Sequence, residues 1–124
     1  MDETSRRRSI GRVSITYSFA GIPVADYAGA NEWYVRLFGR EPDMVPHETE
    51  AVWRLSPRNA IYVVEDPERA GNGLLTLAVD DLDALRARLR EAGLPFVEVA
   101  AGDAPRRLVV TDPDGNTLTY FEDP

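Results

Sequence analysis

Residues 22–39 read IPVADYAGANEWYVRLFG, and residues 77–93 read LAVDDLDALRARLREAG. In both stretches, alternating apolar residues lead through an aspartate into apolar positions three or four residues apart, and a glycine follows. The alternation is typical of a strand, the wider spacing of an amphipathic helix, and the glycine of a helix C-cap. Three pairs of apolar positions repeat at an offset of 55 residues: Ile22 with Leu77, Val24 with Val79, and Leu37 with Ala92. This repeat indicates two copies of one strand-helix unit.

Three further strand candidates follow each helix. The first copy is predicted as a strand over 14–24, a helix over 27–38, and strands at 44–45, 51–55 and 60–64. The second copy is predicted as a strand over 74–79, a helix over 82–92, and strands at 96–99, 108–111 and 117–121. The order βαβββ therefore occurs twice, in residues 13–68 and 69–124, after a flexible tail over 1–12. We expect an α+β fold in which the two modules form a concave mixed sheet with a central cleft.

Composition limits the class of protein. The chain has 124 residues, which is the size of one domain with an ample core. It has no cysteine, which excludes disulfides and thiolate metal sites and favours a reducing compartment. Residues 1–12 lack the apolar core of a secretory signal, and no apolar run is long enough to span a membrane. We expect a cytoplasmic protein.

Net charge argues against two classes of partner. The chain has 21 acidic and 14 basic side chains, for a net charge of −7. Such a charge repels phosphate backbones and anionic lipid headgroups, so we expect neither nucleic acid nor a membrane as partner. The one basic cluster, Arg6 to Arg8, is predicted to be a solvated part of the tail.

Period-two geometry assigns the faces of the predicted strands. Ile22 and Val24 share one phase and should pack beneath the first helix, so the opposite phase should face the cleft. Either Trp53 or Arg54 faces the cleft from the middle strands. The predicted lining residues are Tyr17, Phe19, Trp53, Arg54, Tyr62, Leu74, Thr76, Thr119 and Phe121. Aromatic rings with a few hydroxyls and a guanidinium are typical of a small-molecule pocket, although the same aromatics could simply fill a core.

Several segments, taken in order, resemble one known family. They are Val24-Ala25-Asp26, Trp33-Tyr34, Phe38-Gly39, the strand and helix that begin at Leu75, and the stretch from Thr111 to Leu118. Together they resemble the vicinal oxygen chelate superfamily, which comprises glyoxalases, bleomycin-resistance proteins and extradiol dioxygenases. The resemblance extends over residues 13–121 and implies a homodimer that encloses small molecules.

The resemblance also locates a metal site. Enzymes of this family hold a divalent metal with a His or Gln on the first strand, a Glu late in the first copy, a His opening the second copy, and a Glu on the last strand. The matching positions are Phe19, Tyr62, Leu74 and Thr119. Phenyl and isobutyl groups offer no lone pair, and a neutral phenol or alcohol replaces a carboxylate poorly. We therefore expect no metal and no cofactor.

Other chemistry finds little support in the sequence, and catalytic residues stay unassigned. His47 is the only histidine, and it is predicted to lie in a polar surface loop with Glu48 and Glu50. A Ser-His-Asp arrangement would have to use His47, and no serine and acidic residue stand at a recognisable spacing from it. The segment Gly71-Asn72-Gly73 precedes a strand, which excludes a helix-capping phosphate loop.

Three functions remain open. The first is a metal-free binding protein that holds an aromatic or apolar antibiotic or metabolite in the cleft. The second is a lyase or isomerase with a non-standard metal site or with metal-independent acid-base catalysis by Tyr17, Tyr62 or Arg54. The third is an interaction module whose hollow is closed by its own side chains or by a partner subunit. All three favour a homodimer, because an exposed apolar hollow is a liability in a monomer.

Overall fold

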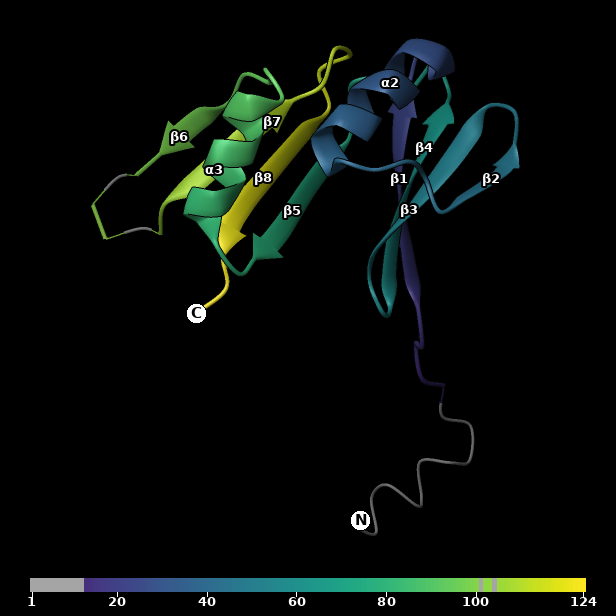
Figure 1. The fold of residues 1–124 in the computed structure, drawn as a ribbon. Coiled ribbons are helices and arrows are strands. Elements are labelled where there is room, and N and C mark those ends of the chain that lie inside the picture. Colours follow the sequence, from purple (N-terminus) through teal and green to yellow (C-terminus); the bar gives the residue numbers. More distant parts are fainter. Residues whose placement is uncertain (1–12, 101, 104) are drawn as a thin grey trace, which may run out of the picture.

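The computed structural model describes residues 13–100, 102–103 and 105–124 and contains two βαβββ modules (Figure 1). The first module consists of β1 (Ser18–Val24), α2 (Tyr27–Phe38), β2 (Met44–His47), β3 (Glu50–Ser56) and β4 (Asn59–Glu65). The second consists of β5 (Leu74–Val79), α3 (Leu82–Glu91), β6 (Val97–Val99), β7 (Arg107–Thr111) and β8 (Thr117–Glu122). The predicted order of elements is confirmed. The predicted flexible tail over 1–12 lies outside the described residues.

Each module forms its own four-stranded mixed sheet. The strand orders are β1-β4-β3-β2 and β5-β8-β7-β6, with β1 parallel to β4, β5 parallel to β8, and the other pairs antiparallel. The pairing register is the same in both sheets. Gly21 and Thr76 stand at the same place in their modules, and they pair with Tyr62 and Thr119, respectively. Each helix covers one face of its own sheet and leaves the other face open (Figure 1).

The first strand is shorter than predicted. It begins at Ser18, where Ser18 pairs with Asn59, the first residue of β4. Residues before Ser18 therefore have no strand beside them, and Val13 and Ile15 are 87% exposed. In the sequence, the alternation of apolar and small residues extends N-terminal to Ser18, where β1 no longer has β4 beside it. The strand β2 extends to His47 through a register irregularity between Met44 and His47.

The C-terminal ends of the two helices stabilise each other. Arg36 of α2 donates from Nη2 to the carbonyl of Ala92, 2.7 Å away, just after α3. Arg88 of α3 donates in return to the carbonyl of Leu37, near the end of α2. A guanidinium at a helix C-terminus satisfies free carbonyls and interacts favourably with the helix dipole. These contacts fix the two modules side by side.

The helix-facing sides of both sheets belong to one hydrophobic core. Ile22 and Val24 are buried beneath α2, and Leu118 and Tyr120 are buried beneath α3, as the period-two pattern predicts. Ala20 has the same phase but is exposed, because α2 covers only the far end of β1. Within the described residues, neither helix combines the length and the apolar character needed to cross a bilayer.

Candidate functional site

Trp53 lies in the core, and Arg54 lies on the open face of the first sheet. The indole is fully buried, 5.4 Å from the ring centroid of Phe38, and its Nε1 donates to the carbonyl of Arg40 over 3.0 Å. Successive residues of a strand point to opposite faces, so the exposed Arg54 points away from α2. The sequence left both residues as candidate lining, and the structure removes Trp53 from that set.

The open face of the first sheet carries an aromatic surface. Phe19 is 57% exposed, and Tyr62 on the neighbouring strand is half-buried. A Cβ atom at Gly21 would lie 2.6 Å from Cζ of Tyr62, so the glycine allows the phenol ring to lie directly on β1. Tyr17 precedes β1, with its ring centroid 4.8 Å from that of Phe19. Its hydroxyl is buried and has no hydrogen-bond partner among the described residues.

The open face of the second sheet combines aliphatic and hydroxyl groups. Leu74 at the start of β5 is 82% exposed, and Thr76 on the same strand is exposed. Thr119 pairs with Thr76, and Phe121 pairs with Ala78. Thr119 and Phe121 are half-buried. This face is therefore apolar with two adjacent hydroxyls.

The four positions that match the family's metal ligands form two equivalent pairs. Phe19 and Leu74 stand at the same place in their modules, and the shared register makes Tyr62 and Thr119 equivalent as well. Each sheet thus presents one hydrocarbon group and one neutral hydroxyl where the resemblance implies nitrogen and carboxylate ligands. This donor set does not fit a divalent metal.

No alternative metal site appears in the described part of the chain. No three side chains of His, Cys, Asp or Glu come together there as a possible metal-binding group. His47 is largely exposed, and its Nε2 lies 2.9 Å from a carboxylate oxygen of Glu50. That arrangement is an ordinary surface contact between neighbours in a hairpin.

A groove separates the two modules on one side of the molecule. It has a volume of about 420 Å³ and is lined by β1, β3 and β4 on one side and by β5 on the other. Of the predicted lining residues, it includes Thr76. The groove contains none of Phe19, Tyr62, Leu74 and Thr119. Phe19 and Tyr62 belong to the first sheet, and Leu74 and Thr119 belong to the second, so one chain divides these four positions between two surfaces.

The segment Asp112–Asn116, which the sequence presented as a common hairpin turn, joins the modules. The buried Asp112 carboxylate accepts from the hydroxyl of Tyr34 at 2.7 Å and from Nδ2 of Asn116 at 2.8 Å. Nδ2 of Asn116 also donates to the carbonyl of Pro23 at 2.8 Å. Tyr34 and Pro23 belong to the first module, so this network holds the second module against it.

Stability should fall in alkaline solution because of buried phenols. Burial raises the pKa of Tyr34 above its ordinary value, with a further contribution from the Asp112 carboxylate, and burial raises the pKa of Tyr120. In the unfolded chain both phenols ionise near pH 10, whereas the folded chain keeps them protonated. This stabilisation is complete below about pH 10 and is lost as the pH rises further. We expect urea unfolding to show a flatter pH profile in Tyr34→Phe than in the wild type; identical profiles would contradict this.

Comparison with known proteins identifies the family. The profile of the Glyoxalase/Bleomycin resistance protein/Dioxygenase superfamily matches residues 15–120. No match was found among curated proteins. A glyoxalase/bleomycin resistance protein from Catenulispora acidiphila is 40% identical, with a TM-score of 0.82 over 87% of this chain and 98% of the other.

Two more distant structures show the same fold. A bleomycin-binding protein from bleomycin-producing Streptomyces verticillus, complexed with copper(II)-bleomycin, is 20% identical, with a TM-score of 0.74 over 90% of this chain and 99% of the other. A lactoylglutathione lyase from Agrobacterium tumefaciens is 16% identical, with a TM-score of 0.71 over 90% and 96%. With the profile and the fold in agreement, the chain belongs to the Glyoxalase/Bleomycin resistance protein/Dioxygenase superfamily.

Proposed function

We propose that this chain is a metal-independent binding protein for an aromatic or apolar small molecule, held against the open faces of its sheets. The observation that carries the proposal is the donor set at the four family positions. Phe19 and Leu74 offer hydrocarbon surface, and Tyr62 and Thr119 offer neutral hydroxyls. Such groups contribute contact area and hydrogen bonds to a ligand, and they give a metal no adequate ligands.

A second copy of the chain completes the site. Phe19 and Leu74 are exposed apolar residues on two different sheets, and soluble monomers rarely leave large apolar patches uncovered. In a two-fold dimer, the first sheet of one copy meets the second sheet of its partner, and this pairing would occur twice. The ligand then lies between the two copies, with Arg54, Thr76 and Thr119 as orienting polar groups.

The dimer is testable by light scattering coupled to size exclusion. One chain has a mass of 13.8 kDa, and we expect a single species of twice that mass at micromolar concentration. Replacing Phe19 with a charged Glu should shift the species towards the monomer, because a carboxylate would be buried in the contact. A wild-type monomer at all concentrations would contradict the shared site.

Ligand binding is testable by calorimetric titration. We would titrate bleomycin, copper(II)-bleomycin and a panel of planar aromatic drugs and metabolites, since a related structure is a bleomycin-binding protein. We expect at least one compound to bind with a Kd well below 1 mM, which corresponds to about −4 kcal/mol. Phe19→Ser should weaken that binding by about tenfold through lost apolar contact.

The matched control is Val45→Ser. Val45 is 53% exposed on β2 but has the opposite phase to Met44, so it does not belong to the open face. It should leave affinity unchanged. Absence of any binding tighter than about 1 mM across the panel would overturn the proposal.

A metal-independent lyase or isomerase is the second candidate, favoured by one observation. The Tyr17 hydroxyl is buried without a described partner beside Phe19, and a neutral phenol in such a place is able to donate a proton to a bound substrate. Turnover of a bound compound, followed by nuclear magnetic resonance, that is lost in Tyr17→Phe while binding persists would favour this candidate over the binding protein.

A further inference from the structure

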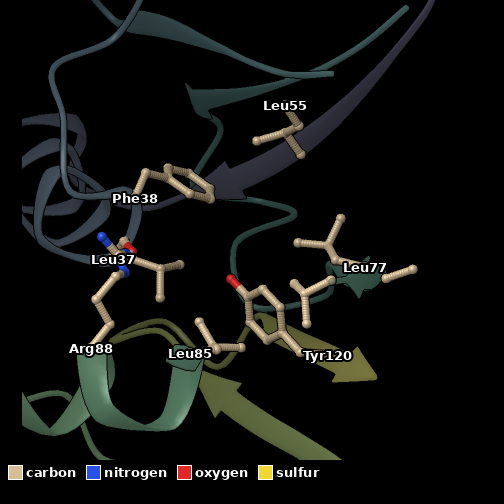
Figure 2. Close-up of a pocket in the computed structure, with 9 residues that line it drawn as sticks. Leu37, Phe38, Leu55, Leu77, Leu85, Arg88 and Tyr120 are labelled. Carbon is tan, nitrogen blue, oxygen red and sulfur yellow. The ribbon is translucent and has the colours of Figure 1, made fainter. Parts of the chain in front are cut away.

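A second pocket lies between the modules, on the helix-covered side of the sheets (Figure 2). We name it the intermodule pocket. Its lining residues are Leu37, Phe38 and Leu55 from the first module, and Leu77, Ala78, Val79, Leu85, Arg88 and Tyr120 from the second. Its volume is about 220 Å³. It contains none of the open-face residues Phe19, Tyr62, Leu74 or Thr119, and it adjoins the groove through Leu55, Leu77 and Ala78, which line both.

A tyrosine hydroxyl lines this pocket. Tyr120 as a whole residue is 5% exposed, and Figure 2 shows its oxygen directed towards Phe38 and Leu37. Burial raises the pKa of the phenol, and the Arg88 guanidinium opposes this rise to a smaller extent. The hydroxyl is thus a neutral donor at pH 7. The hydroxyl is therefore able to donate to a hydrogen-bond acceptor that occupies the pocket.

A cation stands at the same pocket. Arg88 lines it, and Figure 2 shows the guanidinium beside Leu37. The contact with the Leu37 carbonyl uses Nη2 and leaves other N–H groups of the fork for a further acceptor. Gly39, in a left-handed conformation with φ of 72°, has no Cβ and so leaves room for this guanidinium. The pocket therefore combines leucine and phenylalanine walls with two hydrogen-bond donors, one of them charged.

These features define one chemical class of ligand. A cavity of about 150 Å³ lined by apolar side chains accommodates benzene. The intermodule pocket is somewhat larger, which leaves room for one ring and a small anionic group. We propose that the intermodule pocket binds a monocyclic aromatic carboxylate, with its ring among Phe38, Leu77 and Leu85 and its carboxylate accepting from Tyr120 and Arg88. Because ligands here touch both modules, binding stabilises their contact.

Benzoate is the probe for the test, titrated into the wild-type protein by calorimetry and followed by amide shifts in a nitrogen-15-labelled sample. We expect a Kd of about 1 mM or tighter. Tyr120→Phe should weaken binding about fivefold by removing the hydroxyl donor, and Arg88→Gln should weaken it about tenfold by removing the charge. Neutral benzyl alcohol should bind the wild type more weakly than benzoate does. Arg88→Gln should bind benzyl alcohol and benzoate with equal affinity.

The open-face variant Phe19→Ser is the matched control and should bind benzoate with the same affinity as the wild type. Failure of the benzoate proposal is therefore distinguishable from failure of the proposed function. Amide shifts in the wild type need no variant, and we expect them at residues 37–39, 85–88 and 119–121. Three results would overturn the proposal: no binding tighter than about 10 mM, an affinity unchanged in both Tyr120→Phe and Arg88→Gln, or shifts centred on Phe19, Tyr62 and Leu74.

Discussion

Replacing Asp112 with alanine should lower the free energy of unfolding by about 3–5 kcal/mol, because several buried donors lose their acceptor at once. The carboxylate accepts from the Tyr34 hydroxyl and from Nδ2 of Asn116, and its other oxygen accepts from the backbone N–H groups of Asp114 and Asn116. Alanine supplies none of these bonds, and water cannot replace them readily at a site that is 4% exposed. The loss falls on the contact between modules as well as on the turn.

Urea unfolding followed by circular dichroism measures this loss. The matched control is Asp80→Ala, since Asp80 is exposed, and it should change stability by less than about 0.5 kcal/mol. Tyr34→Phe removes one hydroxyl from the same network and should cost about 1–2 kcal/mol. If Asp112→Ala were as stable as Asp80→Ala, the network would not join the modules as described.

Trp53→Ala should also destabilise the chain by about 3–5 kcal/mol, because it removes a fully buried indole and leaves a cavity beneath α2. The ring packs against Phe38 and Tyr34, with centroids 5.4 and 6.3 Å away, and its N–H satisfies the carbonyl of Arg40. Both the apolar contacts and that hydrogen bond are lost in the variant.

Trp33→Ala makes the same chemical deletion at a half-buried position on α2 and should cost clearly less. The comparison uses chemical denaturation of both variants under identical conditions. Equal losses, or a larger loss for Trp33→Ala, would show that Trp53 is not the central residue of the first module's core.

The repeat of apolar positions predicted the fold well because burial in this chain is one-sided. In β1, Ile22 and Val24 are buried while Gly21 and Phe19 are exposed, so the sequence alternation reports the faces directly. The same logic failed at β3, where Ala51, Val52 and Trp53 are all buried. A run of three apolar residues gives no phase, which is why Trp53 and Arg54 could not be distinguished before the structure.

Long-range contacts set the rest of the architecture. The turn at Asp112 has an ordinary hairpin sequence, yet its partners Tyr34 and Pro23 lie 78 and 93 residues away in the chain. The intermodule pocket likewise depends on how two helix ends approach each other through Arg36 and Arg88. Local patterns carry no information on such pairings. Tyr120 was correctly expected beneath its helix, but the direction of its hydroxyl emerges only from the packing of both modules.

The chain therefore offers two chemically different surfaces. The open faces present Phe19, Tyr62, Leu74 and Thr119, with Arg54 on the first of them, and the proposed function places a larger ligand there. The intermodule pocket is smaller and carries the guanidinium of Arg88. Ligands for the two surfaces should differ in size, and we expect no competition between benzoate and a ligand held by Phe19, Tyr62, Leu74 and Thr119.

Metal binding by the purified protein is the most direct test of a metal-independent open face. After treatment with a chelator, the protein would be titrated by calorimetry with Ni²⁺, Zn²⁺, Mn²⁺ and Fe²⁺ and then measured by elemental analysis. We expect no stoichiometric uptake of any of the four ions. One equivalent of tightly bound metal that is lost when Tyr62 and Thr119 are replaced by Phe and Val would contradict the proposed function at its foundation.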